Sequence, residues 1–125
     1  MRRLGFAILL MAHCAAVAIA AISSSRWENV PAKDHARANP LAGQTEAATA
    51  GALVYREHCQ QCHKANAEGD EHRRPTLRSE RIRTASDGDL EWFLRQGDIR
   101  RGMPSWSSLP QAQRWQVIAY LRSIQ

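Results

Sequence analysis

Cys59-Gln60-Gln61-Cys62-His63 is the most informative motif of this 125-residue chain. Two cysteines three positions apart, followed directly by a histidine, form the attachment signature of a covalently bound c-type haem. The spacing has a chemical reason, because both thiols can reach the two vinyl groups of one porphyrin and the next residue then lies beneath the iron. Neutral imidazole is a good ligand of haem iron. The motif therefore predicts one haem c, held by Cys59 and Cys62, with His63 as the proximal iron ligand.

Two other kinds of site also use a Cys-x-x-Cys pair. A redox dithiol is usually surrounded by alternating strands and helices, and this sequence lacks that pattern. A structural zinc site would need further ligands from His58, His63 or His72, and no second Cys-x-x-Cys or His-x-x-x-His pair follows. The sequence therefore favours haem over zinc or dithiol chemistry.

The length of the chain leaves room for one small domain. The part that follows the first fifty residues would be marginally stable without a covalent staple or a large cofactor. A haem fixed through two thioether bonds would supply the missing apolar core. Of the three cysteines, Cys14 falls in an N-terminal apolar segment, so the pair in the motif is left for haem and no disulfide is expected.

The chain is only mildly basic. Lys and Arg number 17 and Asp and Glu number 12, which gives a formal charge of +5. Arg2 and Arg3 belong to the N-terminal segment, so residues 26–125 carry a net charge of +3. A nucleic-acid partner would predict a denser basic face with aromatic stacking residues. We therefore expect no nucleic-acid partner.

Residues 1–25 are expected to act as an export signal or a signal-anchor. Met1-Arg2-Arg3 is a short basic start, and a weakly apolar run follows over residues 4–22. A cleavable signal peptide would use a small-residue site at Ala16-Val17-Ala18 or Ala18-Ile19-Ala20. An uncleaved anchor is the alternative, because 19 residues can just span a bilayer and attach the protein to the membrane. Both alternatives stay open, with the anchor slightly favoured.

Every version of this segment leads to the same location. Lipoprotein processing at Cys14 is disfavoured because His13 is a poor residue before such a cysteine. Whether the protein is tethered or soluble, the haem motif is expected in the periplasm or on the outer face of the cytoplasmic membrane.

Residues 26–46 are expected to form a linker. They lack apolar periodicity and carry Pro31, Pro40 and Gly43 among small polar residues. A flexible tether is the favoured interpretation, and a segment packed along the domain is the alternative.

Residues 47–125 are expected to form an all-α domain without strands. A first helix starts near Ala47 and runs into the haem motif. After an irregular loop over residues 64–83, a second helix is predicted over 87–96, with Ser86 as the N-cap and Gly97 as the stop. A last helix is predicted over 110–124, with Pro110 in its first turn.

Met103 is the candidate for the second axial position of the iron. It lies in a loop between Gly102 and Pro104, 44 residues after Cys59, and the other two methionines fall within residues 1–25. A thioether ligand raises the reduction potential and gives a saturated iron suited to electron transfer. A core residue filling a gap is the alternative role, but a methionine in this loop is an unusual core residue.

Taken together, these motifs resemble a class I (mitochondrial-type) cytochrome c over roughly residues 47–125. More narrowly, the chain is similar to small single-haem cytochromes related to terminal oxidase and periplasmic dehydrogenase subunits. The matched residues, in order, are Gly51, Tyr55, the Cys-x-x-Cys-His motif, Pro75, Leu77, Gly102-Met103-Pro104, Trp115, Tyr120 and Leu121. The resemblance implies three to four helices wrapped around one haem.

The resemblance also implies roles for individual residues around the cofactor. The Pro75 carbonyl would accept the Nδ1 proton of His63. Leu77 would pack on the haem edge and Trp106 would lie near the ligand loop. Gly51 and Tyr55 would cross the last helix near Trp115 and Tyr120.

Seven arginines cluster on both sides of the predicted second helix. A solvated surface is the favoured interpretation. In the alternative, one or two arginines compensate the haem propionates and others steer an acidic redox partner. The cluster comprises Arg73, Arg74, Arg78, Arg81, Arg83, Arg100 and Arg101.

These features predict an electron carrier rather than an enzyme. Single electrons would pass between a periplasmic dehydrogenase or membrane complex and a terminal oxidase. The alternative is a haem enzyme subunit or gas sensor in which the sixth position is open or Met103 is easily displaced. A bis-histidine site would need His58 or His72 opposite His63.

Overall fold

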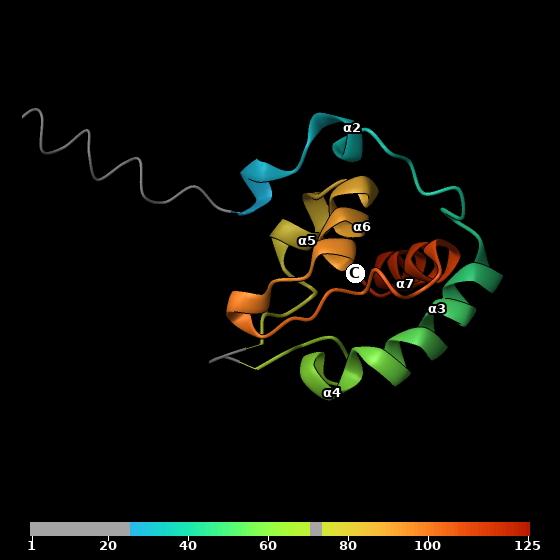
Figure 1. The fold of residues 1–125 in the computed structure, drawn as a ribbon. Helices are drawn as coiled ribbons and strands as arrows, with labels where there is room; N and C mark the ends of the chain where they lie inside the picture. Colours follow the sequence, from blue (N-terminus) through green and yellow to red (C-terminus); the bar gives the residue numbers. More distant parts are fainter. Residues whose placement is uncertain (1–25, 71–73) are drawn as a thin grey trace, which may run out of the picture.

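The computed structural model describes residues 26–70 and 74–125 (Figure 1). The predicted export segment, with Cys14 and the apolar run 4–22, lies outside the described residues, as do His72 and Arg73. Within the described ranges the elements are helical, and the only extended pairing is a single bridge between Asp98 and Met103. None of the helices in these ranges is long and apolar enough to cross a membrane.

The described helices confirm the all-α prediction. Two are 3₁₀ helices, η1 and η2, and the others are α-helices. In chain order they are η1 (Arg26–Asn29), α2 (Ala32–His35), α3 (Thr45–His58), α4 (Gln60–His63), α5 (Glu80–Thr84), α6 (Asp87–Gln96), η2 (Ile99–Arg101) and α7 (Gln111–Ser123).

Helix α6 begins and ends where the sequence predicts. At its start, the Ser86 hydroxyl accepts from the Asp89 N–H at 3.0 Å, and the Asp89 carboxylate accepts from the Ser86 N–H at 2.9 Å. This reciprocal cap satisfies two backbone donors that a helix start leaves free. At the end, Gly97 has a φ of +68°, and a Cβ there would lie 2.6 Å from the Pro104 carbonyl. Glycine is therefore required for both the turn and the close approach of the following loop.

Helix α5 was not expected, because the sequence predicted an irregular loop over residues 64–83. It is a short helix of five residues with one buried side chain, Ile82. Ser79 caps it, since its hydroxyl accepts from the Ile82 N–H at 3.4 Å. One buried position gives no periodic pattern to detect.

Helices α3 and α7 cross closely, as expected from the resemblance (Figure 1). A Cβ on Gly51 would lie 1.9 Å from the Gln116 carbonyl oxygen, so only glycine allows this approach. Four residues along α3, the Tyr55 ring lies 5.2 Å from that of Tyr120. The crossing fixes the end of α3, and therefore the haem motif that follows it, relative to α7.

Two groups of buried side chains form the core. One contains Val54, Tyr55, Ala67, Val117 and Leu121, and the other contains Ile82, Leu90, Trp115 and Ile118. Two partly buried leucines, Leu77 and Leu94, pack against both groups. The core is thus two apolar clusters joined by two leucines rather than one continuous mass.

Residues 26–44, which we call the N-terminal arm, pack on the domain instead of forming the free tether that the sequence favoured (Figure 1). Arg37 pairs with Glu91 at 2.7 Å, and the Asn39 side-chain amide donates to the Trp115 carbonyl at 3.0 Å. His35 lies 2.9 Å from Asp89. Two apolar side chains of the arm, Trp27 and Leu41, also pack on the second core cluster. Isolated polar and apolar contacts of this kind leave no apolar periodicity in the sequence.

We expect Gly51→Ala to lower the free energy of unfolding by about 1–3 kcal/mol, the usual cost of overpacking. A Gly→Ala change in a helix otherwise gains about 0.5–1 kcal/mol, so the sign of the result reports the crossing. Denaturant unfolding of the holoprotein measures it. Thr49→Ala, at an exposed site on α3, is the control and should change stability by less than about 0.5 kcal/mol. A stabilised Gly51→Ala variant would contradict the close crossing.

Candidate haem site

The haem motif lies at the junction of α3 and α4. Cys59 ends α3 through its N–H, which donates to the Tyr55 carbonyl at 2.8 Å. The Cys59 carbonyl then accepts from the N–H groups of Cys62 and His63, at 3.1 and 2.9 Å. One turn of backbone therefore presents all three side chains. The Tyr55 hydroxyl donates to the Lys64 carbonyl at 2.7 Å, which ties the end of this turn back to α3.

All three residues of the motif line one cavity of about 310 Å³. Its walls come from η1, α3, α4, α5, α6, α7 and the loops that carry Pro75 and Met103. Most of its lining side chains are apolar, as a porphyrin requires. They include Tyr55, Leu77, Ile82, Leu90, Phe93, Leu94, Trp106, Val117 and Leu121.

The imidazole of His63 is oriented by a backbone carbonyl. Its Nδ1 lies 3.1 Å from the Pro75 oxygen, the contact that the resemblance implied. A carbonyl can only accept, so Nδ1 carries the proton and Nε2 keeps the lone pair that binds a metal. Burial lowers the pKa of His63, the Pro75 hydrogen bond acts against this, and the nearby Arg74 charge lowers the pKa further. The ring is therefore neutral at neutral pH, the form that binds iron.

The Cys59 sulfur is buried enough to stay protonated. Burial, with a smaller contribution from Cys62, raises the pKa of the Cys59 thiol to about 11. The thiol rather than the thiolate is thus present at neutral pH in a folded chain that lacks haem, and thiols are poor nucleophiles.

A glycine that the sequence reasoning missed places the Pro75 carbonyl. Gly69 has a φ of +68°, and a Cβ there would lie 2.2 Å from the Arg74 carbonyl oxygen. Its N–H donates to the His63 carbonyl at 2.9 Å, and the Leu77 N–H donates to Ala67 at 2.8 Å. The loop therefore folds back onto the haem motif. Gly69 is the sole glycine in the loop over residues 64–83, and this was the available signal.

Met103 reaches the same cavity from the loop after α6. Asp98 and Met103 exchange two backbone hydrogen bonds, of 2.8 and 3.0 Å. Gly102, with a φ of +80°, makes the turn between them. The Trp106 N–H donates to the Leu94 carbonyl at 2.8 Å, which fixes the far end of the loop on α6.

Some of the other predicted site residues line the haem cavity, and others lie away from it or outside the described residues. Leu77 and Trp106 line the cavity, as does His58. The His58 ring packs 5.1 Å from the Trp106 ring. His72, the other candidate for a bis-histidine site, lies outside the described residues. Of the arginine cluster, Arg74 and Arg101 line the cavity, whereas Arg83 pairs with Glu80 at 2.8 Å.

The donor set fits a covalently bound haem. Two thiols, one oriented imidazole and one thioether surround an apolar cavity, which matches the needs of the ring and of its iron. Across residues 26–70 and 74–125, no group of three or more His, Cys, Asp or Glu side chains could hold a metal ion by itself. A structural zinc site would need such a group.

A comparison with protein families agrees with this geometry. Residues 46–121, more than half of the chain, match the family model described as cytochrome c oxidase, cbb3-type, subunit III. The chain belongs to this family. Membership makes it a small haem-binding cytochrome of the electron-carrier kind, related to terminal oxidase subunits, with covalently bound haem c and the class I cytochrome c fold. The comparisons with curated proteins and with solved structures gave no match.

One wall of the cavity comes from outside the region that the cytochrome family model matches. Trp27 of the N-terminal arm lines the cavity together with Phe93 of α6. Neither residue was named for the site from the sequence, because the arm was expected to be a tether and the helix over 87–96 was not expected to contribute to the haem cavity. An aromatic residue in a segment without periodicity was the available signal for Trp27.

We expect Cys62→Ala to retain the haem through one thioether bond only. One vinyl group then stays conjugated with the porphyrin, so the alkaline pyridine spectrum should shift to longer wavelength. Haem should remain on the chain in a denaturing gel, and the double variant Cys59→Ala/Cys62→Ala should lose it. Cys14→Ala is the control and should keep the wild-type pyridine spectrum. Covalent haem in the double variant would contradict the assignment.

Proposed function

We propose that this cytochrome is a single-electron carrier whose haem iron is bound by His63 and Met103. The observation that carries the proposal is that both side chains line one apolar cavity. His63 comes from the end of α4 and Met103 from the loop after α6, and backbone hydrogen bonds hold both segments in place. Bound haem supplies the iron that accepts and releases one electron. A site with two protein ligands leaves no open position for a substrate, which favours a carrier over an enzyme or a gas sensor.

Each ligand has a stated task in this proposal. The hydrogen bond from Nδ1 to the Pro75 carbonyl keeps the His63 ring in one orientation and strengthens it as a donor. The Met103 thioether favours the reduced iron and so raises the reduction potential. The apolar walls of the cavity, which include Leu77 and Trp106, exclude water from the haem. A dry site also favours the reduced iron.

The proposed location and partners follow from the N-terminal sequence and the family. We place the haem domain in the periplasm or on the outer face of the cytoplasmic membrane, with residues 1–25 as export signal or signal-anchor and 4–22 as the attachment. The family points to redox partners in terminal oxidase complexes. A periplasmic dehydrogenase or another membrane complex would then supply the electrons.

Two arginines of the cluster already pair with a carboxylate, Arg83 with Glu80 at 2.8 Å and the more exposed Arg101 with Asp98 at 3.8 Å. Arg100 and Arg101 are exposed beside the Met103 loop, and Arg101 and Arg74 also line the cavity. We assign Arg74 and Arg101 to compensation of the haem propionates and Arg100 to the surface that attracts an acidic partner.

We expect Met103→Ala to change the absorption spectrum of the ferric protein and to let the reduced protein bind carbon monoxide. Loss of the thioether opens one iron position and lowers the reduction potential. Spectra recorded with and without carbon monoxide measure both effects, and Met11→Leu is the control, because it leaves the domain intact. Ready binding of carbon monoxide by the reduced wild type would reject the carrier. An unchanged Met103→Ala spectrum would reject the ligand.

A second expectation concerns charge near the haem. Oxidation of the reduced protein by anionic ferricyanide should slow several-fold between low salt and 0.5 M salt, because salt screens exposed charges. Arg100→Gln should lower the low-salt rate, whereas Arg83→Gln, whose side chain already pairs with Glu80, should leave it nearly unchanged. Stopped-flow absorbance gives both rates. A rate independent of salt would rule out steering.

A further inference from the structure

Trp27 is the part of the N-terminal arm that reaches the haem cavity. Its ring centroid lies 4.1 Å from that of Phe93, and the two planes are inclined at 35°. The indole also packs against the core cluster around Ile82 and Leu90. Ile82 and Leu90 line the haem cavity, as do Trp27 and Phe93. Trp27 of the arm and Phe93 of α6 therefore form an aromatic wall of this cavity.

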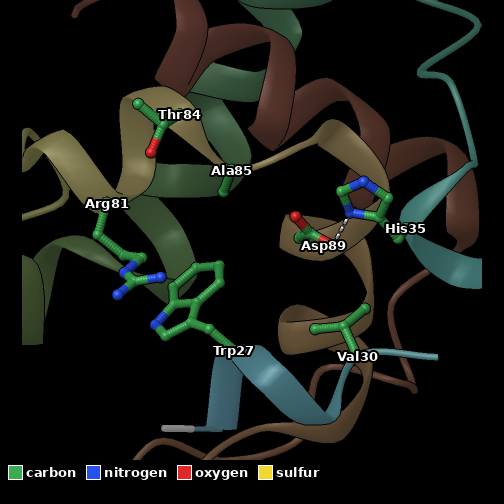
Figure 2. A pocket seen from close by; sticks show the side chains of 7 residues that line it. All are labelled: Trp27, Val30, His35, Arg81, Thr84, Ala85 and Asp89. Atoms are coloured by element: carbon green, nitrogen blue, oxygen red, sulfur yellow. Dashed lines mark hydrogen bonds and ion pairs between the residues drawn. The ribbon is translucent and has the colours of Figure 1, made fainter. Parts of the chain in front are cut away.

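The same indole also borders a second pocket. This pocket, of about 210 Å³, lies between the arm, α5 and α6 (Figure 2). Polar groups contribute to its lining, among them Arg81, Thr84 and the His35–Asp89 pair, and His35 and Arg81 are exposed to solvent. Trp27 is therefore the shared wall between an apolar cavity and a polar, solvent-reaching pocket.

The residue before Trp27 connects the arm to the Met103 loop. The Arg26 guanidinium pairs with the Asp98 carboxylate at 3.7 Å, and Asp98 is the residue that exchanges two backbone hydrogen bonds with Met103. The Arg26 guanidinium also lies 5.6 Å from the centre of the Phe93 ring. These two neighbouring arm residues thus contact both the wall of the cavity and the base of the ligand loop.

The arm is fastened firmly enough to hold this position. A Cβ on Gly88 would lie 1.9 Å from the Asp34 carbonyl oxygen, so the arm touches α6 backbone to backbone. The buried Asp34 carboxylate pairs with Arg95 at 2.5 Å. Glu91, which is fully buried, pairs with Arg37 at 2.7 Å. A buried charge deprived of its partner is costly, so these pairs oppose detachment.

From this arrangement we propose that the N-terminal arm closes the haem cavity and that Trp27 is a positioning residue of the haem site. The indole packs against the haem ring and separates it from the polar pocket, while Arg26 braces the Met103 loop. Excluding water from the haem disfavours the extra charge of ferric iron and raises the reduction potential. The imidazole rate and the role of Arg26 rest on the proposed function, in which Met103 binds the iron. The effect of Trp27 on the reduction potential needs only a bound haem.

The test compares Trp27→Ala, Trp27→Phe and Trp92→Ala in the full-length holoprotein. Trp92 is a matched control, because its ring packs on Phe93 at 5.1 Å and lies 5.4 Å from the Arg26 guanidinium, but does not line the cavity. Two quantities are measured, the midpoint potential and the rate at which the ferric protein binds added imidazole. Circular dichroism and denaturant unfolding accompany them, so that a general loss of structure is recognised.

Trp27→Ala should favour the oxidised form about tenfold at a fixed ambient potential, which for one electron corresponds to a fall of about 59 mV. Imidazole should bind several-fold faster. Trp27→Phe should restore most of both values, and Trp92→Ala should stay close to the wild type. A wild-type potential and imidazole rate in Trp27→Ala, or an equal change in Trp92→Ala, would overturn the proposal.

Two further outcomes are also decisive. If Trp27→Ala does not assemble with haem, Trp27→Leu takes its place, and a wild-type potential in Trp27→Leu overturns the proposal. If the wild type itself binds carbon monoxide readily, the His63/Met103 carrier fails. The dependence of the potential on Trp27 is still measurable in that case, so the two failures are distinguishable.

Discussion

The constraint on which the structure depends is that the domain is small and buries a modest share of its surface, so that it is marginally stable without a large cofactor. Its buried residues form two clusters, joined by Leu77 and Leu94, and the cavity lined by the haem motif reaches members of both. A covalent haem completes the packing. The close crossing at Gly51 serves the same end, because it sets where α3 delivers the motif relative to α7. Binding of the cofactor is therefore expected to stabilise the folded domain.

A network of buried ion pairs also fixes how the segments of the domain pack together. Glu91 on α6 has no exposed surface and pairs with Arg37 of the arm and Arg114 of α7, at 2.7 and 3.0 Å. Such a network contributes little net stability over apolar packing, but breaking it is costly, so it selects one arrangement of three segments. The arm therefore has a fixed place on the domain and provides no free length between residue 25 and the haem site.

Local signals made much of this structure predictable. Ser86 and Gly97 mark the ends of α6 because a cap and a positive φ depend on residues within one turn. Helix α5 escaped prediction, since five residues with one buried side chain carry no period. The arm was not predicted for a related reason. Its contacts are made by isolated side chains, polar ones such as Arg37 and Asn39 and the apolar Trp27 and Leu41. The partners of Arg37 and Asn39 lie 54 and 76 residues away in the chain.

The sequence by itself determined the cofactor, because Cys59, Cys62 and His63 must be neighbours in the chain to reach the two vinyl groups and the iron of one haem. It also determined that the domain is helical. Only the tertiary structure decided what surrounds that haem. The Pro75 carbonyl reaches His63 through a loop that folds back at Gly69, and Trp27 reaches the cavity through an arm fastened to α6. Contacts between distant segments depend on how the helices pack, which no short stretch of sequence encodes.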